Sequence, residues 1–123
     1  MQLKDEQTKI LLSYENDEEI DNDLDKVWYW YHKAAENHNN GVSLYKLGEF
    51  YESGKGVGEN KARAFAFYKE AAEKGNTNGK YKLGYCYEHG FGTYADTKKA
   101  IDLYKEAAKK GHSDAQKRLL YEF

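Results

Sequence analysis

The sequence of 123 residues has no proline, only one cysteine (Cys86) and no long apolar run. The absence of proline beside 11 glycines favours helices separated by glycine breaks over a loop-rich or disordered chain. A single cysteine excludes a disulfide scaffold and a metal site built from several thiolates. No segment approaches the roughly 18 consecutive apolar residues of a membrane span, and the mean hydropathy is -1.01. The sequence therefore excludes a transmembrane protein and a disulfide-held fold.

The first residues, MQLKDEQTKILLSYENDEE, contain no basic start followed by an apolar block and a cleavage site. A secretory signal is therefore not expected within them. Together with the single cysteine, this predicts a cytoplasmic location. The chain length suits one domain. Aromatic residues make up 15% of the chain, with 12 tyrosines, and supply ample material for a packed core.

Charge is distributed unevenly along the chain. The net charge is -2, but residues 1–25 carry nine acidic residues against two lysines, which is -7, so the remainder carries +5. The acidic run could bind a basic partner, although a solvated segment is the preferred interpretation because such runs usually need no partner. The C-terminal third is basic, yet acidic residues interleave with its lysines and the sequence pI is about 6.1. Nucleic acid is therefore not expected as a partner.

Two consecutive segments of 36 residues repeat each other. Residues 43–78 align on 79–114 with 16 identities. A weaker copy precedes them, since WYWYHKAAE at 28–36 matches FAFYKEAAE at 65–73, and AQKRLLYEF at 115–123 repeats the start of the unit. A fixed period of roughly 20 to 50 residues indicates stacked supersecondary units. The chain is thus predicted to contain about three helical hairpins and a closing half-unit.

Each unit has the pattern of a helix, a glycine turn and a second helix. In the first helix, small and apolar residues recur at spacings of three and four, which puts them on one face: Ser43, Leu47, Gly48 and Tyr51. Gly48 and its counterpart Gly84 suggest that another helix backbone approaches there. Glycines then end the helix, because the residue beyond a helix end often needs a positive φ: Gly54, Gly56, Gly90 and Gly92. Asn60 and Asp96 are expected to cap the second helices, and Asp23 falls at the same place in the weaker copy.

The second helix of each unit is expected to bury alanines and aromatic residues. Paired alanines let neighbouring helices approach closely, and the aromatic rings fill the remaining gaps. These residues are Ala64, Phe65, Tyr68, Ala71 and Ala72, with the counterparts Ala100, Ile101, Tyr104, Ala107 and Ala108. Gly75 and Gly111 are expected to end the helix. In the weaker copy, Trp28 and Trp30 fall on the positions of aromatic core residues, so at least one of them is expected in the core, with Trp30 the more exposed.

The pattern Leu-Gly-x-x-Tyr-x-x-Gly-x-Gly followed by Ala-x-x-x-Tyr-x-x-Ala-Ala-x-x-Gly resembles the Sel-1-like repeat, a relative of the tetratricopeptide repeat. A tetratricopeptide unit has a period of about 34 residues and usually ends in proline, whereas this chain has a period of 36 and no proline. Val57 completes the Gly-x-Gly-Val of the family in one unit, and Thr93 replaces the valine in the next. In the weaker copy, Asp17 and Glu19 replace the turn glycines, so that turn is not expected to keep the shape of the family.

The resemblance implies an all-α fold, a right-handed α-solenoid of helix-turn-helix repeats in a single domain. The implied units are a degenerate repeat at 1–42, repeats at 43–78 and 79–114, and a partial repeat helix at 115–123. The resemblance also implies an adaptor for other macromolecules. The disulfide-linked subgroup of the family is excluded because the chain has one cysteine.

Catalytic, metal and cofactor sites are not expected. The Gly-x-Gly turns follow no strand and do not continue to Gly-Lys-Ser/Thr, as a phosphate-binding loop would. No His-x-x-x-His pair exists, and no carboxylate stands at ligand spacing from a histidine: the histidines are His32, His38, His89 and His112. No Ser, Cys or Lys lies in a nucleophile motif, and Cys86 is expected to be a small packed residue rather than a reactive thiol. We therefore expect neither an enzyme nor a bound metal or cofactor.

The resemblance further implies that the first helix of every unit lines a concave groove. The groove residues would be Tyr45, Glu49 and Glu52 in one unit, Tyr81, Tyr85, Glu88 and His89 in the next, and Lys117 and Tyr121 in the closing half-unit. Tyrosine combines a large apolar area with a polar tip, which suits interfaces. The glutamates would favour Lys or Arg on a ligand. Alternatively, the tyrosines pack between helices, and both interpretations remain open.

Two functions follow from these expectations. The first is an adaptor or scaffold that binds a peptide or protein segment in the groove, without membrane insertion. The second is a structural spacer, whose repeats stack within a longer array or beside a catalytic domain such as a protein kinase. Leu119, Leu120 and Phe123 have no helix after them in the sequence. They could form a stacking surface or support end-to-end self-association.

Overall fold

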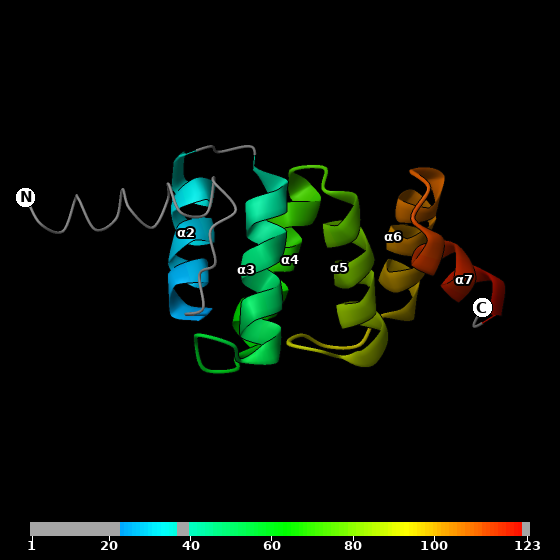
Figure 1. The fold of residues 1–123 in the computed structure, drawn as a ribbon. Helices are drawn as coiled ribbons and strands as arrows, with labels where there is room; N and C mark the ends of the chain where they lie inside the picture. The colour runs from blue at the N-terminus through cyan, green and yellow to red at the C-terminus, as the bar shows by residue number, and fades with distance from the viewer. Residues whose placement is uncertain (1–22, 37–39, 122–123) are drawn as a thin grey trace, which may run out of the picture.

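The computed structural model describes residues 23–36 and 40–121, which form six helices and no strand (Figure 1). The helices are α2 (Asp23–Glu36), α3 (Gly41–Ser53), α4 (Lys61–Glu73), α5 (Thr77–His89), α6 (Thr97–Lys109) and α7 (Ser113–Tyr121). Most of the acidic run, the turn at Asp17 and Glu19, His38 and Phe123 lie outside the described residues. The predicted all-α fold is confirmed.

The helices are laid side by side in chain order rather than around a common centre. Each helix from α2 to α7 packs against the next, except that the connection from α2 leads to α3 of the following unit. In Figure 1, α3, α5 and α7 lie toward the viewer, with α4 behind α3 and α6 behind α5. The helices α3 and α5 also contact each other directly. The described chain is therefore an α-helical repeat solenoid whose first helices share one side.

Glycines and cap residues set the helix ends largely as predicted. Gly54 and Gly90 follow the first helices with φ of 75° and 66°, in the left-handed region that glycine tolerates. Asn60 and Asp96 cap α4 and α6, since their side chains accept hydrogen bonds from the backbone N–H of the third residue on. The prediction for Asp23 is wrong, because α2 already includes this residue as its first.

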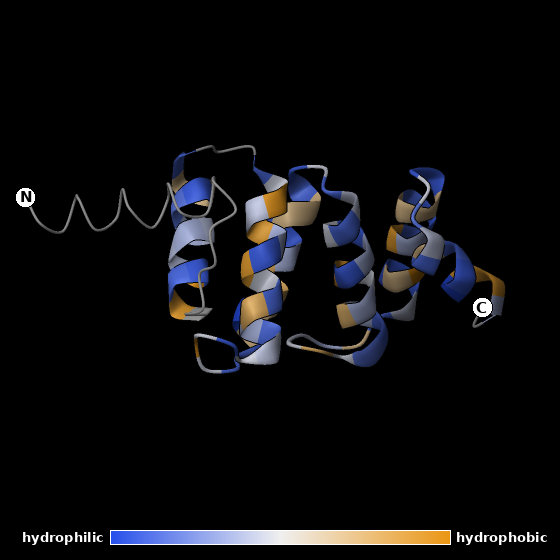
Figure 2. Ribbon diagram, viewed as in Figure 1, coloured by the Kyte–Doolittle hydropathy of each residue, from blue (hydrophilic) through white to orange (hydrophobic). Residues whose placement is uncertain are grey.

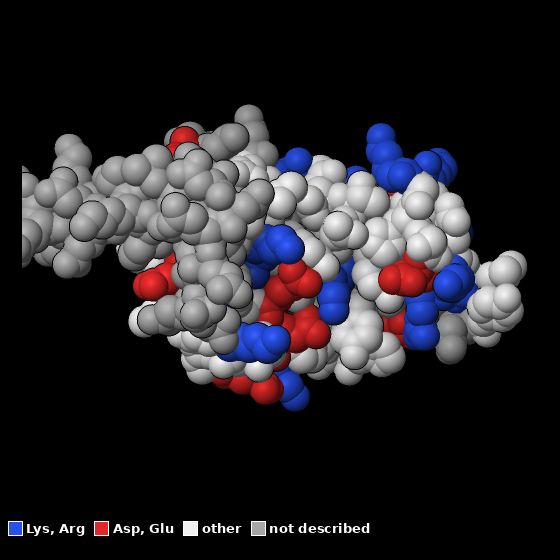
Figure 3. All heavy atoms as spheres, in the orientation of Figure 1, with Lys and Arg blue, Asp and Glu red and all other residues white. Residues whose placement is uncertain are grey.

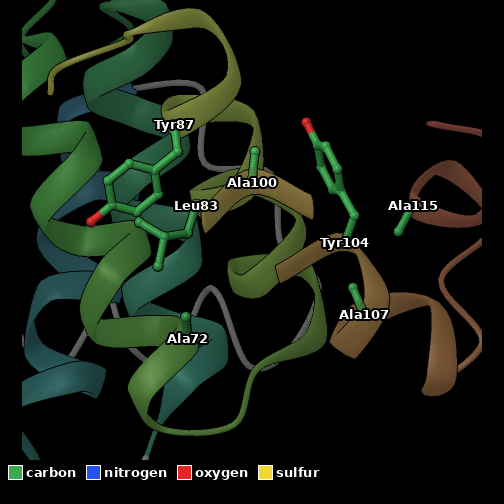
Figure 4. Close-up of a cluster of buried hydrophobic side chains, with 7 residues drawn as sticks. All are labelled: Ala72, Leu83, Tyr87, Ala100, Tyr104, Ala107 and Ala115. Carbon is green, nitrogen blue, oxygen red and sulfur yellow. The ribbon is translucent and has the colours of Figure 1, made fainter. Parts of the chain in front are cut away.

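Alanine and tyrosine form the core between helices. Ala64, Tyr68, Ala100 and Tyr104 are fully buried. Figure 4 shows one cluster, in which Tyr104 and Ala107 of α6 lie near Ala115 of α7. Figure 2 shows the matching surface pattern, with apolar positions interrupted by polar ones along every helix. The predicted burial of the second helices is thus confirmed for their alanines and tyrosines, while Phe65, Ile101 and Ala108 are half-buried.

The glycines inside the first helices accommodate an aromatic ring rather than a helix backbone. A Cβ at Gly48 would lie 2.5 Å from Cε1 of Tyr68, and a Cβ at Gly84 would lie 2.9 Å from Cε1 of Tyr104. Both approaches are closer than real Cβ contacts permit. The sequence correctly indicated a close approach, but the tyrosine of the second helix of the same unit makes it.

Helix α2 buries other positions than its alignment with α4 predicts. Val27 and Tyr29 are each 7% exposed, whereas Trp28 and Trp30 are both half-buried. Tyr31, which aligns with the fully buried Tyr68, is 57% exposed. The expectation that a tryptophan enters the core is therefore wrong. Helix α4 packs between α3 and α5, whereas α2 packs on α3, so the two helices turn different faces to their neighbours.

Candidate functional site

The predicted groove residues all lie on the helices that share one side of the solenoid. We call the side formed by α3, α5 and α7 the first-helix face. Figure 3 views this face and shows carboxylates gathered over α3, with cationic side chains around them. Residues on three separate helices are therefore brought onto one surface, although not all of them are equally available there.

Glu52 and Glu88 are bound within the protein. The hydroxyl of Tyr68 donates a hydrogen bond to Oε1 of Glu52 at 2.5 Å, and the hydroxyl of Tyr104 donates to Oε1 of Glu88 at 2.6 Å. The next first helix adds a cation to each carboxylate. Nζ of Lys82 lies 3.3 Å from Oε1 of Glu52, and Nη2 of Arg118 contacts Oε2 of Glu88.

We call this repeated arrangement the Glu–Tyr–cation ladder. Each carboxylate joins the second helix of its own unit to the first helix of the next unit. The side chain of Glu88 is 14% exposed and that of Glu52 is 30% exposed. Their oxygens already have protein donors, so these carboxylates are less available to a basic ligand than the sequence suggested.

Burial also keeps the ladder tyrosines protonated. Desolvation raises the pKa of Tyr68 and of Tyr104 well above the usual value, and the hydrogen bonds to Glu52 and Glu88 raise them further. On the surface side, burial and then the nearby Glu49 raise the pKa of Tyr45 to about 12. These phenols therefore remain donors at neutral pH.

Tyr45 and Tyr81 pack between helices. Their rings lie 5.8 and 5.6 Å, between centroids, from the rings of Tyr68 and Tyr104. Tyr81 also stacks on His112, with the centroids 4.5 Å apart and the planes 18° from parallel. Both tyrosines are half-buried. The packing interpretation therefore describes much of their surface, and each leaves only part of its ring on the first-helix face.

Tyr85 and Tyr121 present more usable aromatic surface. Tyr85 lies beside His89, with ring centroids 4.4 Å apart, and Nζ of Lys82 lies 5.3 Å from the centre of its ring. Tyr121 on α7 is 78% exposed, and Lys117 on the same helix is exposed too. Tyrosines with accessible faces beside cations suit contact with an apolar or aromatic partner residue.

A hollow of about 470 Å³ opens where α2, α3 and α5 meet. It is lined by Trp30, Lys46, Glu49, Phe50, Glu52, Ser53, Lys55 and Lys82. Glu49 keeps part of its carboxylate on the surface, 3.8 Å from Nζ of Lys46. The hollow thus combines aromatic walls with a rim of mixed charge.

Sequence reasoning missed several residues of this surface. Trp30 and Phe50 were assigned to the helix packing pattern, and Lys82 and Arg118 were not singled out. A signal for the cations was present, because Lys46, Lys82 and Arg118 repeat at a spacing of 36 residues. No comparable signal marks the hollow, because Trp30 and Phe50 come from different units and meet only in the folded chain.

The structure offers no counterpart to a metal or membrane site in residues 23–36 and 40–121. No cluster of three or more His, Cys, Asp or Glu side chains occurs there, and none of these helices has the length and apolar character to cross a bilayer. Cys86 is fully buried, and desolvation raises the pKa of its thiol to about 12. Its thiolate fraction is therefore small at neutral pH.

Comparison with known proteins agrees with this geometry. The family model described as Sel1 repeat matches residues 10–39, 41–76 and 78–112. The chain belongs to the Sel1 repeat family. Members of this family generally mediate protein–protein interactions, and the family is typically non-catalytic. No curated protein matches the sequence.

Solved structures of other Sel1 repeat proteins share the fold. A Sel1 repeat protein from Oxalobacter formigenes is 30% identical, with a TM-score of 0.78, over 93% of this chain and 85% of that chain. The protective antigen c5321 of uropathogenic Escherichia coli, which has an SLR fold, is 27% identical, with a TM-score of 0.81, over 94% of this chain and 24% of its own. Helicobacter pylori cysteine rich protein B is 32% identical, with a TM-score of 0.67, over 73% and 66%. This Sel1 repeat chain thus spans about a quarter of the length of the E. coli antigen.

Proposed function

We propose that this Sel1 repeat domain is a non-enzymatic adaptor that binds a peptide or protein segment along the first-helix face. The observation that carries the proposal is the accessible aromatic surface of Tyr85 and Tyr121, continuous with the hollow walled by Trp30 and Phe50. Aromatic side chains at the centre of an interface commonly supply most of its binding free energy. A repeat solenoid offers such residues to an extended ligand on successive helices.

The preferred segment is one with apolar or aromatic residues rather than a purely basic one. Glu52 and Glu88 already accept hydrogen bonds from tyrosine and lie against cations. Glu49 remains the partly exposed carboxylate at the hollow, and Lys55 is an exposed cation on the same rim. Charge on this face is therefore balanced, which leaves apolar contact as the main source of affinity.

A Tyr85→Ala variant tests this function. Peptides selected on the purified wild-type chain from a random display library are expected to bind the variant about tenfold or more weakly, as loss of a central interface aromatic does. Affinities are measured by isothermal titration, and circular dichroism checks that the variant is folded.

Tyr94→Ala is the matched control. Tyr94 is 62% exposed on the loop between α5 and α6, outside the first-helix face. It removes the same side chain and is expected to leave the affinity unchanged. Selected peptides that bind Tyr85→Ala as tightly as wild type, or that lose affinity equally with Tyr94→Ala, would contradict binding at this face.

A structural spacer remains the second candidate, because α7 exposes apolar surface. Leu120 is 74% exposed and Tyr121 is 78% exposed, while Leu119 packs inward on the core. If this surface stacks on a second copy, sedimentation equilibrium should show association that rises with protein concentration. Leu120→Lys should abolish it, because a charge cannot be buried there without cost. A wild-type chain that stays monomeric, or an unaffected variant, argues against the spacer.

A further inference from the structure

The three first helices begin with the same capping bond, made by residues spaced 36 apart in the sequence. Oδ1 of Asn40 accepts a hydrogen bond from the N–H of Ser43 at 3.0 Å, and Oδ1 of Asn76 accepts from the N–H of Gly79 at 2.7 Å. At α7 the corresponding residue is His112, whose Nδ1 accepts from the N–H of Ala115 at 3.2 Å. The cap of α7 is therefore titratable, whereas asparagine caps α3 and α5.

The surroundings of His112 assign its neutral form. Nε2 lies 2.9 Å from Oδ1 of Asn78, an oxygen that can only accept, so Nε2 carries the proton. Nδ1 is then free of hydrogen and accepts from Ala115. The ring is held between this bond and the stack on Tyr81. Both ring nitrogens and one ring face are thus committed to the neutral state.

We propose that protonation of His112 weakens the docking of α7 on the rest of the solenoid. An imidazolium carries N–H groups at both nitrogens, so the N–H of Ala115 loses its acceptor. The new positive charge also lies at the N-terminus of α7, where the helix dipole is positive. Asn40 and Asn76 do not change charge, so α3 and α5 keep their caps.

The charges around His112 largely offset one another. From α5, Tyr81 is an uncharged phenol whose pKa is raised by burial and by Asp114, and its ring favours a stacked cation. On α7, Asp114 also favours the imidazolium, whereas Lys109 and Lys110 at the end of α6 oppose it. Farther along, Lys80 of α5 pairs with Glu106 of α6, whose atoms lie 3.7 Å apart. The lost capping bond is not replaced by any of these groups.

Docking of α7 matters for the first-helix face because this helix holds one rung of the ladder. Ala115 is fully buried, Leu119 packs on the same cluster, and Arg118 contacts Glu88. Histidine ordinarily changes charge between about pH 5 and pH 8. Since the docked helix requires the neutral ring, docking is complete above the titration of His112 and weakens as the pH falls through it.

Amide hydrogen exchange of the full chain, measured by NMR and corrected for intrinsic rates, tests the proposal without any ligand. The titration runs from about pH 7.5 down to the pH at which the His112 ring signals show protonation. Over this range, the opening equilibrium of the α7 amides should rise about fivefold, the effect of losing one N-cap. The amides of α5, under Asn76, should not respond.

His112→Asn is the matched control, because it installs the cap residue that α3 and α5 already use. It should keep α7 protected at every pH, while His32 and His89 titrate as before. Protection of α7 that stays constant in the wild type while the His112 ring protonates would overturn the proposal. An equal loss of protection in His112→Asn would overturn it as well. Neither outcome bears on peptide binding, so this inference and the proposed function fail separately.

Discussion

A Gly92→Ala variant is expected to lower the free energy of unfolding by about 3 kcal/mol, because steric overlap adds to backbone strain. Gly92 has a φ of 70°, in the region that L side chains rarely adopt. A Cβ there would overlap the carbonyl oxygen of Lys61 and lie 2.9 Å from Cβ of Phe65. The turn of one unit thus rests on the start of α4 in the preceding unit, and urea denaturation measures the loss.

Gly75→Ala separates the two contributions. Gly75 has a φ of 85°, but no atom lies within 4 Å of the position that its Cβ would take. This variant should cost about 1 to 2 kcal/mol, the cost of the left-handed conformation alone. Gly58→Ala, with open space and no positive φ at the glycine, should be nearly neutral. If Gly92→Ala is no worse than Gly75→Ala, the turn does not bear on α4.

Glu88→Ala is expected to destabilise the fold by about 3 kcal/mol, because it leaves buried partners unpaired. The hydroxyl of Tyr104, a residue with no exposed surface, loses its acceptor, and Arg118 loses its carboxylate. The variant should also loosen α7, since Arg118 belongs to that helix. Thermal and urea unfolding give the magnitude.

Glu49→Ala is the control for Glu88→Ala. Glu49 is an exposed carboxylate whose pair with Lys46 has both side chains more than 40% exposed, at 44% and 43%. Removing it should change stability by at most about 0.5 kcal/mol. Adding Tyr104→Phe to Glu88→Ala should recover part of the loss, because the orphaned hydroxyl is gone. Equal effects of Glu88→Ala and Glu49→Ala would mean that the ladder does not stabilise the stack.

Local features of the structure followed closely from the sequence. The glycines after the first helices and the caps at Asn60 and Asp96 depend on one or two residues of backbone. Such features are decided by the residue itself, since glycine alone tolerates the left-handed turn and a short polar side chain satisfies the first N–H groups. The repeat then fixes their spacing. This is why the helix boundaries of the two strong units could be predicted.

Features that depend on a neighbouring unit could not be predicted in the same way. Tyr45 and Tyr81 were expected on the groove with packing as the alternative, and the structure places part of each ring against a tyrosine of the second helix. Glu52 and Glu88 were expected to be open to a ligand. Their partners lie 16 and 30 residues away in sequence. Which atoms meet over such separations depends on how the helices cross.

The sequence by itself determined the helical hairpin, its period of 36 residues, its glycine corners and the family. Those properties come from side chains that act on their own stretch of backbone or on one face of one helix. Only the tertiary structure decided which carboxylates are paired, which face of α2 is buried and where a hollow opens beside Trp30. These depend on the approach of separate helices, because hydrogen bonds and packing act over a few ångströms, whatever the distance along the chain.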